Sequence, residues 1–215
     1  MNDLLESYLS AVLRENEKIN LTNIRDHSVA RILHLEDSLA ALDELNRAPE
    51  GLYGDLGSGG GFPGVPLAIA SGRTTMLIDS VKKKMAVVGS IIQEIGLDQQ
   101  ISLYDKRIEE LAQEKPSAFS VLTARALSSL PSLLELASPL LKQDGQLICL
   151  KAHTDEELEC AKTIEIQTGM KLISKRSFYL SDNESYREIV VFEKNSTPTM
   201  KLPRRIGLAQ KKPLA

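Results

Sequence analysis

Hydrophobic positions recur along this chain in two different spacings. Over roughly the first 45 residues, apolar side chains lie three and four positions apart, as on one face of an amphipathic helix. Further on, short apolar runs predict strands at 51–56, 74–79, 100–104, 118–123 and 145–151. Helical patterns separate them at 64–71, 81–95, 107–113, 130–142 and 154–168. Repeated strand and helix units are typical of a parallel sheet covered by helices.

The pattern changes near the end of the chain. Apolar and polar residues alternate over 171–180 and 186–193 around a polar turn, which predicts an antiparallel hairpin. We therefore expect a doubly wound α/β fold, a Rossmann-like sheet of about seven strands, mostly parallel, with an antiparallel C-terminal hairpin. The expected organisation is a single domain with an N-terminal helical extension (1–48), an α/β core (49–194) and a basic tail (195–215).

A glycine-rich loop joins the first predicted strand to the helix that follows. Five glycines lie between positions 57 and 64, just after Asp55. Glycine reaches positive φ freely and allows backbone N–H groups to approach a ligand closely. Strand, glycine loop and helix together are typical of nucleotide binding in doubly wound folds, and the alternative is a tight turn without a ligand.

The loop can be aligned with two cofactor motifs. Gly57-x-Gly59-x-Gly61 is the form usual in methyltransferases that bind S-adenosylmethionine, and Gly59-x-Gly61-x-x-Gly64 satisfies the dinucleotide pattern. The second alignment starts further from the strand and puts Pro63, which has no N–H, where a pyrophosphate needs a donor. We therefore favour S-adenosylmethionine, bound on the core domain.

An acidic residue stands at the end of the second predicted strand. Asp79 follows Gly57 by 22 residues, about where a carboxylate meets the ribose hydroxyls of an adenosyl ligand. It could instead cap the next helix, and both roles are compatible. Lys82, Lys83 and Lys84 then fall in the first turn of that helix, where the macrodipole disfavours cations. They indicate either an anionic partner or a solvated charge run.

Composition narrows the setting of the protein. With 215 residues, 42% of them hydrophobic, the chain can bury a core of domain size. Neither its two cysteines nor its three scattered histidines have the spacing of metal ligands, so we expect no metal. The first residues carry charges where a signal peptide has its apolar core, and no stretch could span a membrane. We expect a cytoplasmic protein that makes no membrane contact.

Charge is distributed unevenly along the chain. The net charge is −3, yet residues 194–215 hold six lysines and arginines and no acid, so the preceding 193 residues carry −9. A basic tail can neutralise phosphates, and a solubilising disordered terminus is the alternative.

Taken in order, the motifs resemble those of the RsmG (GidB) family, bacterial methyltransferases that modify N7 of a guanosine in 16S ribosomal RNA. The matching segments are Asn20-Leu21-Thr22, His34-Leu35-Glu36-Asp37-Ser38, Asp55 to Gly64, Leu77-Ile78-Asp79-Ser80, Lys106 to Glu110, Thr123-Ala124-Arg125-Ala126 and Leu202-Pro203-Arg204-Arg205. The fold expected is then the methyltransferase variant of the doubly wound sheet.

The resemblance also implies a site. It implies cofactor contacts in the loop, a ribose contact, two residues beside the adenine, and one residue shared with the substrate: Gly57, Gly59, Gly61, Phe62, Asp79, Ile108, Glu109 and Arg125. It implies 16S ribosomal RNA or the small ribosomal subunit as partner, and we expect Arg204 and Arg205 to contact RNA and the protein to be a monomer.

Two cations end strands of the predicted sheet. Arg125 follows the apolar run of the fourth strand, where ligands bind in open α/β sheets, and it could hold an anionic group or form a structural ion pair. Lys151 ends the fifth strand, but Ala152 follows it where the family commonly has glycine. Arginine and lysine are common partners of the O6 and N7 edge of guanine, so both are candidate catalytic residues that would orient the base.

The expected chemistry needs no general base, because guanine N7 carries a free lone pair at neutral pH. Accordingly, the chain lacks the Asn/Asp-Pro-Pro-aromatic motif of enzymes that methylate exocyclic amines. A methyltransferase acting on a small molecule or protein, and a non-catalytic RNA-binding module, are the competing hypotheses. His34 and Asp37 lie three residues apart and could hydrogen-bond to each other on one helical face, in a structural role.

Overall fold

The computed structural model describes residues 1–215, the whole chain. Its centre is a sheet of seven strands in the order β3-β2-β1-β4-β5-β7-β6. The strands are β1 (Tyr53–Leu56), β2 (Thr75–Ile78), β3 (Ile101–Tyr104), β4 (Phe119–Arg125), β5 (Leu141–Lys151), β6 (Met170–Tyr179) and β7 (Tyr186–Lys194). The first five are parallel, and β7 pairs antiparallel with both β5 and β6. The predicted fold class is confirmed, including the closing hairpin.

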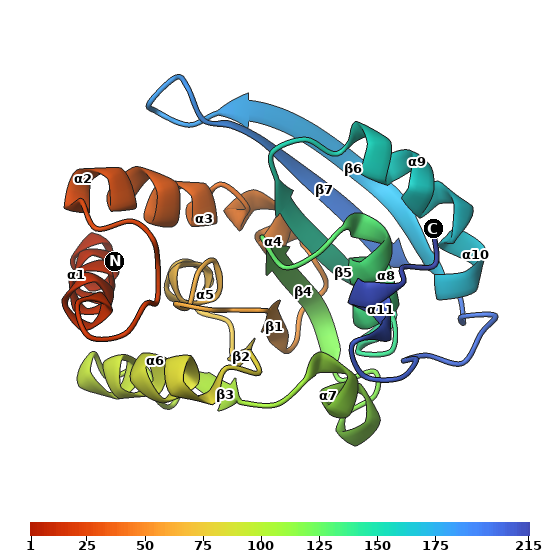
Figure 1. Cartoon of the computed structure of the whole chain (residues 1–215), viewed down its shortest axis with the longest axis horizontal. Helices are drawn as coiled ribbons and strands as arrows, with labels where there is room; N and C mark the ends of the chain where they lie inside the picture. The colour runs from red at the N-terminus through yellow and green to blue at the C-terminus, as the bar shows by residue number, and fades with distance from the viewer.

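Helices cover both faces of the sheet, as Figure 1 shows. They are α1 (Asn2–Asn16), α2 (His27–Ala30), the π-helix η1 (Arg31–Glu36), α3 (Asp37–Leu39), α4 (Leu42–Arg47), α5 (Gly64–Ser71), α6 (Lys82–Glu94), α7 (Ile108–Glu114), α8 (Leu130–Ala137), α9 (Asp155–Thr163), α10 (Glu165–Thr168) and α11 (Leu208–Lys211). The helices up to α6 pack on one face and the later ones on the other, because successive side chains of each strand point to opposite faces.

Two predicted helices end differently in the structure. The helix expected over 130–142 ends at Ala137, and the fifth strand starts four residues earlier than expected, at Leu141. Pro139 explains the early stop, because proline lacks the N–H that a continuing helix needs. The helix expected over 154–168 is divided into α9 and α10 at Ile164, and it ends at Gly169 in the left-handed conformation.

The tail expected over 195–215 is packed rather than extended. Within it, α11 lies against α8 (Figure 1), and Ala209 is 1% exposed inside the core cluster of that face. The alternative of a disordered terminus is therefore wrong for this part of the chain.

The register of the sheet brings the candidate site together. Leu56 at the end of β1 pairs with Ile78 of β2 on one side and with Ala124 of β4 on the other. The residues that follow each of these, Gly57, Asp79 and Arg125, therefore lie along one edge of the sheet. Between β1 and β4 the strand order reverses direction, which is where ligands bind in open α/β sheets.

Candidate functional site

The glycine loop has the backbone conformation that its sequence predicts. Gly57, Gly59 and Gly61 have φ values of 71°, 55° and 83°, in the left-handed region that disfavours other residues. A Cβ at Gly57 would lie 2.6 Å from a methyl group of Leu127, and one at Gly61 would collide with the hydroxyl of Tyr8. Both positions thus need glycine for conformation and for space.

The side chain of Asp55 stabilises this loop by hydrogen bonds. Its carboxylate is fully buried, and it accepts hydrogen bonds from the Gly64 N–H (3.1 Å) and the Thr123 hydroxyl (2.7 Å). Burial raises the pKa of Asp55 to about 6, although these hydrogen bonds favour its charged form. The acidic residue of the motif therefore shapes the loop and links β1 to β4.

Asp79 contacts the glycine loop and the residue that begins the next helix. One carboxylate oxygen accepts a hydrogen bond from the Gly59 N–H at 2.9 Å, and the other accepts from the N–H of Val81, the N-cap residue of α6, at 2.8 Å. Asp79 therefore supports the start of α6 without capping it, and its predicted ribose contact stays a prediction. The hydrogen bond from Gly59 fixes the glycine loop against the end of β2. The three lysines, Lys82 to Lys84, lie in the first turn of α6 as expected, and Lys82 and Lys83 are exposed.

Four of the residues predicted to bind the cofactor line one small cavity of about 60 Å³. They are Gly57, Asp79, Ile108 and Glu109, and Leu127 and Gln210 complete the wall beside them. The fit to an adenosyl ligand is supported by the bare backbone at Gly57, where a side chain would collide with Leu127, and by carboxylates at Asp79 and Glu109 that can accept hydrogen bonds. Gln210 carried no sequence pattern that could have identified it.

Phe62 lies at the other end of the loop. Its ring stacks on His34 with 4.6 Å between centroids, and the Arg125 guanidinium lies 5.9 Å from its centroid. Tyr8 of α1 contacts the same ring edge-on and donates a hydrogen bond to the Gly60 carbonyl (2.8 Å). The N-terminal helices thus pack directly on the glycine loop through Tyr8 and His34. The sequence pattern did not predict this packing.

Arg125 forms an ion pair at the centre of the site. Its Nη1 donates to the Asp37 carboxylate at 2.9 Å and to the Leu33 carbonyl at 3.1 Å. The other oxygen of Asp37 accepts from Nε of Arg187 on β7 at 3.0 Å. The structural ion pair weighed for Arg125 is therefore present, while its predicted contact with cofactor or substrate stays a prediction.

The hydrogen bond considered possible between His34 and Asp37 is absent. Nε2 of His34 contacts the Thr22 hydroxyl at 2.7 Å, and Asp37 is occupied by two arginines. Both residues belong to or adjoin η1, where a wider turn with hydrogen bonds five residues apart separates side chains that a regular α-helix would align. Burial, and secondarily the charge of Arg125, lowers the pKa of His34 to about 4.

Lys151 contacts α9, which follows β5, and the segment just before α8, which precedes it. Its Nζ donates to both carboxylate oxygens of Glu157, at 2.6 and 2.9 Å, and to the Ser128 carbonyl. Glu157 also accepts from the Leu130 N–H at the start of α8. The structure thus shows Lys151 bracing two helices, and its catalytic role near guanine O6 stays a prediction.

The two tail arginines differ. Arg204 forms two parallel hydrogen bonds to Glu135, at 2.7 and 2.5 Å, and Glu135 is only 1% exposed. The structure thus pairs the charge of Arg204 with a buried carboxylate, and its predicted contact with RNA stays a prediction. Arg205 is exposed and stays a candidate for RNA contact.

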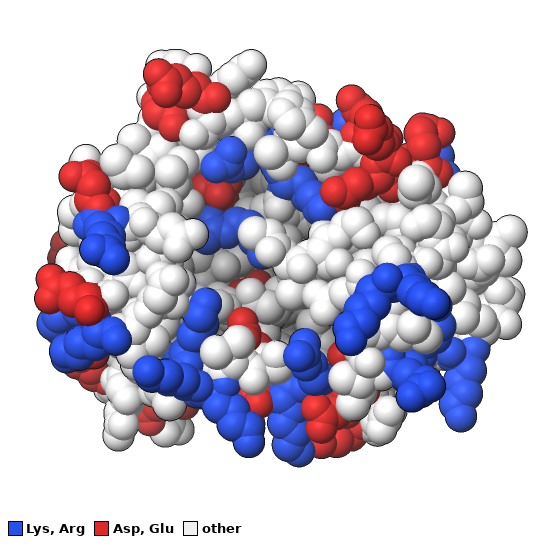
Figure 2. Space-filling view, viewed as in Figure 1, with Lys and Arg blue, Asp and Glu red and all other residues white.

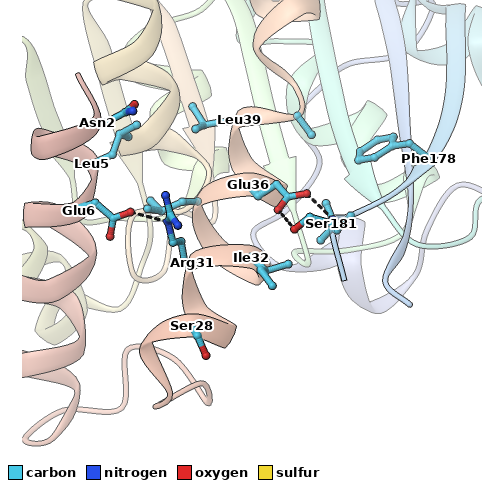
Figure 3. A pocket seen from close by; sticks show the side chains of 13 residues that line it. Asn2, Leu5, Glu6, Ser28, Arg31, Ile32, Glu36, Leu39, Phe178 and Ser181 are labelled. Atoms are coloured by element: carbon cyan, nitrogen blue, oxygen red, sulfur yellow. Dashed lines mark hydrogen bonds and ion pairs between the residues drawn. The ribbon is translucent and has the colours of Figure 1, made fainter. Parts of the chain in front are cut away.

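The largest cavity, about 780 Å³, lies elsewhere, between α1, the α2 to α3 segment and the β6–β7 turn (Figure 3). Glu36 accepts two hydrogen bonds from Ser181 across it, and Glu6 pairs with Arg31 at 2.7 Å. No residue of the glycine loop lines this cavity. Figure 2 shows a separate hollow over the ends of β4 and β5, with lysine and arginine side chains on its walls and lower rim.

No group of histidine, cysteine, aspartate or glutamate side chains is arranged to hold a metal ion. Nor does any helix have the length and apolar character needed to cross a bilayer.

The fold and the glycine loop define a Rossmann-like methyltransferase. Among solved structures, the chain resembles geranyl diphosphate methyltransferase in complex with sinefungin, with a TM-score of 0.60 and 10% identity over 74% of this chain and 78% of the other. TrmN from Thermus thermophilus matches with a TM-score of 0.54 and 20% identity, covering 73% and 48% of the two chains. These likenesses show the fold.

The sequence itself identifies the family. The model of the family GidB, described as rRNA small subunit methyltransferase G, matches residues 1–185. The ribosomal RNA small subunit methyltransferase G of Bacillus pumilus is 33% identical, covering 97% of this chain and 89% of the relative. That of Streptococcus pyogenes serotype M1 is 36% identical, with 97% and 90% covered. The chain belongs to this methyltransferase family.

Proposed function

We propose that this protein transfers a methyl group from S-adenosylmethionine to N7 of a guanosine in 16S ribosomal RNA. The observation that carries the proposal is the single cavity lined by Gly57, Asp79, Ile108 and Glu109 at the ends of adjacent parallel strands. Family membership supports the same conclusion, since the relatives are named as methyltransferases of the small ribosomal subunit RNA. It makes an unrelated small molecule or protein the weaker choice of substrate.

Each part of the cavity has a distinct role in holding the cofactor. At Gly57 the bare backbone permits close approach, and Asp79 accepts hydrogen bonds from the ribose while its Gly59 contact keeps the loop in place. Ile108 and Glu109, at the start of α7, lie beside the adenine. When bound, S-adenosylmethionine supplies an electrophilic methyl group.

The residues around the loop are suited to orientation and not to proton transfer. His34 is neutral at physiological pH because its pKa is lowered to about 4, and both carboxylate oxygens of Asp55 are hydrogen-bonded. Guanine N7 needs no base, so the protein's task is to align the lone pair with the methyl group and exclude water. The guanidinium of Arg125 lies beside Phe62, which supports it over Lys151 as the cation that contacts guanine O6.

RNA would approach over the hollow at the ends of β4 and β5. Lysines and arginines along the rim of this hollow in Figure 2, and the exposed Arg205, Lys211 and Lys212, can neutralise its phosphates. We propose that the protein acts as a monomer in the cytoplasm, on 16S ribosomal RNA or the assembled small subunit.

The test combines binding with product analysis. Titration calorimetry with S-adenosylmethionine should show Asp79→Ala weakened by about 1–3 kcal/mol, with S-adenosylhomocysteine affected equally, because the lost hydrogen bonds are to the ribose. Asp98→Ala, an exposed aspartate at a loop, is the matched control. Incubation with small subunits lacking the modification should produce 7-methylguanosine, detected by mass spectrometry of nuclease digests. Binding of S-adenosylmethionine without any methylation of RNA would favour a different substrate.

A further inference from the structure

The C-terminal segment Arg204–Lys212 reaches the same cavity as the glycine loop. Gln210 lines that cavity together with Gly57, Asp79 and Glu109, although it follows them by about a hundred residues or more. In Figure 1, α11 lies against α8. Gln210 of the tail therefore lines the cavity in which we propose that the adenosyl group binds.

The segment also contacts Glu109 directly. Oε1 of Glu109 accepts a hydrogen bond from the Gly207 N–H at 2.6 Å, and Glu109 is only 5% exposed. Gly207 has a φ of 74°, a conformation that turns its N–H toward α7 and that glycine adopts without strain. The tail amide thus orients one carboxylate oxygen and leaves the other for a further donor.

The segment is firmly seated on the protein. Arg204 makes its paired hydrogen bonds to the buried Glu135 and one more to the Lys212 carbonyl, at 2.7 Å. The Ser132 hydroxyl donates to the Ala209 carbonyl at 2.8 Å, and the Ala209 side chain is buried. Leaving a buried carboxylate without its partner is costly, so this pair favours the seated position of the segment.

We propose that Arg204–Lys212 forms the outer wall of the cofactor site, with Gln210 contacting the adenine and the Gly207 N–H orienting Glu109. The proposal rests on the function proposed above. With this segment seated, the cavity is about 60 Å³, below the few hundred Å³ typical of ligand sites, so an adenine entering it would press against Gln210. A glutamine amide can pair with adenine through one donor and one acceptor, as it does in nucleic acid recognition.

The competing possibility is that the segment blocks the site and must leave before the cofactor binds. The two arrangements predict opposite effects when the segment is released. If the segment contacts the cofactor, its release weakens binding of S-adenosylmethionine. If the segment blocks the site, its release strengthens that binding.

The decisive variant is Ala209→Arg, which cannot seat a long charged side chain in the core and should release the segment. Ala215→Arg, the same change at an exposed position, is the matched control. Calorimetry should show at least about tenfold weaker binding of S-adenosylmethionine for Ala209→Arg and wild-type binding for Ala215→Arg. 5′-Methylthioadenosine, which keeps the adenine and ribose but lacks the amino acid group, should lose affinity by the same factor.

A variant with an exposed side chain covers the case in which Ala209→Arg does not fold. Gln210→Ala should weaken both ligands by roughly three- to tenfold while leaving the melting temperature unchanged. Unchanged or tighter binding in the folded variants would overturn the proposal that this segment contacts the cofactor. If the wild-type protein itself failed to bind S-adenosylmethionine, the proposed function would fail instead, so the two failures are distinguishable.

Discussion

The two halves of the site are built in different ways. On the β1 and β2 side, the predicted cofactor contacts depend on backbone conformation, through Gly57, Gly59 and Gly61, and on one carboxylate, Asp79, that braces the loop. On the β4 and β5 side, the polar groups are long cations, and each is paired with an acid. Arg125 pairs with Asp37, and Lys151 pairs with Glu157.

The difference shows that the charges of the second half contribute first to architecture. Asp37 connects Arg125 of β4 to Arg187 of β7, so one carboxylate ties the N-terminal helices to both parts of the sheet. Arg125 and Lys151, the cations at the ends of β4 and β5, therefore already have acidic partners in the folded protein. Four predictions would break or sharpen this comparison.

The largest effect is expected at Gly57. In Gly57→Val the added side chain would meet Leu127 and the β-branched residue would resist a φ of 71°, so binding of S-adenosylmethionine should fall by more than about a hundredfold. Gly72→Val is the matched control, because Gly72 has the same φ of 71° with nothing within 4 Å of an added Cβ. Calorimetry on the two folded variants measures the difference, and equal affinities would move the cofactor away from this loop.

Next in size is the loss of the shared carboxylate. Asp37→Ala leaves Arg125 and Arg187 without their acid in a partly buried site, and it should lower the free energy of unfolding by about 3–5 kcal/mol. Glu94→Ala removes the exposed ion pair with Arg14 and should leave the free energy of unfolding nearly unchanged, because solvent screens this pair. Urea unfolding of both variants tests this contrast. A cost for Asp37→Ala as small as that for Glu94→Ala would show that the arginines are solvated without it.

A smaller effect is expected in the pH dependence of stability. Between pH 3.8 and about 6, folded Asp55 holds a proton that the unfolded chain has lost, so its contribution to stability falls as pH rises. Between about 4 and 6.5, unfolded His34 holds a proton that the folded protein lacks, so its contribution rises with pH.

These two contributions oppose each other in the wild-type protein. Asp55→Asn should make stability rise more steeply with pH over this range, and His34→Gln should make it rise less or fall. Unfolding in urea at a series of pH values from 4 to 7 gives both slopes. Slopes that shift in the same direction would show that one of the two pKa assignments is wrong.

The smallest effect is expected at the tail. Arg205→Ala should flatten the salt dependence of RNA binding by about one phosphate contact, with cofactor affinity unchanged, because Arg205 is exposed. Arg204→Ala should instead lower stability through the unpaired Glu135. Titration of 16S ribosomal RNA across a salt series, beside thermal melts, separates the two. An identical salt slope for Arg205→Ala and wild type would remove this residue from the RNA surface.

Most of the core could be predicted from sequence because its signals are local. The strands β1 to β4 and the two strands of the closing hairpin lie within two residues of their predicted limits. Only β5 starts clearly earlier than predicted. Each arises from a short apolar run or an alternation that the neighbouring turn residues delimit. The helix boundary missed near Ala137 was also local, since Pro139 was visible in the sequence.

The errors at the site have a different origin. His34 and Asp37 were paired on the assumption of a regular helix, and the π-helix η1 changes which residues share a face. The pairing of Arg204 was missed because its partner, Glu135, lies 69 residues earlier and no spacing connects them. Gln210 was missed for the same reason, as were the contacts of Tyr8 with the glycine loop.

The sequence alone determined the doubly wound sheet, the conformation of the glycine loop and the position of Asp79, because these follow from hydrophobic period, glycine φ preferences and the ends of adjacent strands. Only the tertiary structure decided which cations are paired, which helices cover the loop and that the tail lies beside the cofactor cavity. Such contacts join segments tens of residues apart, and their energies depend on burial that no local pattern records.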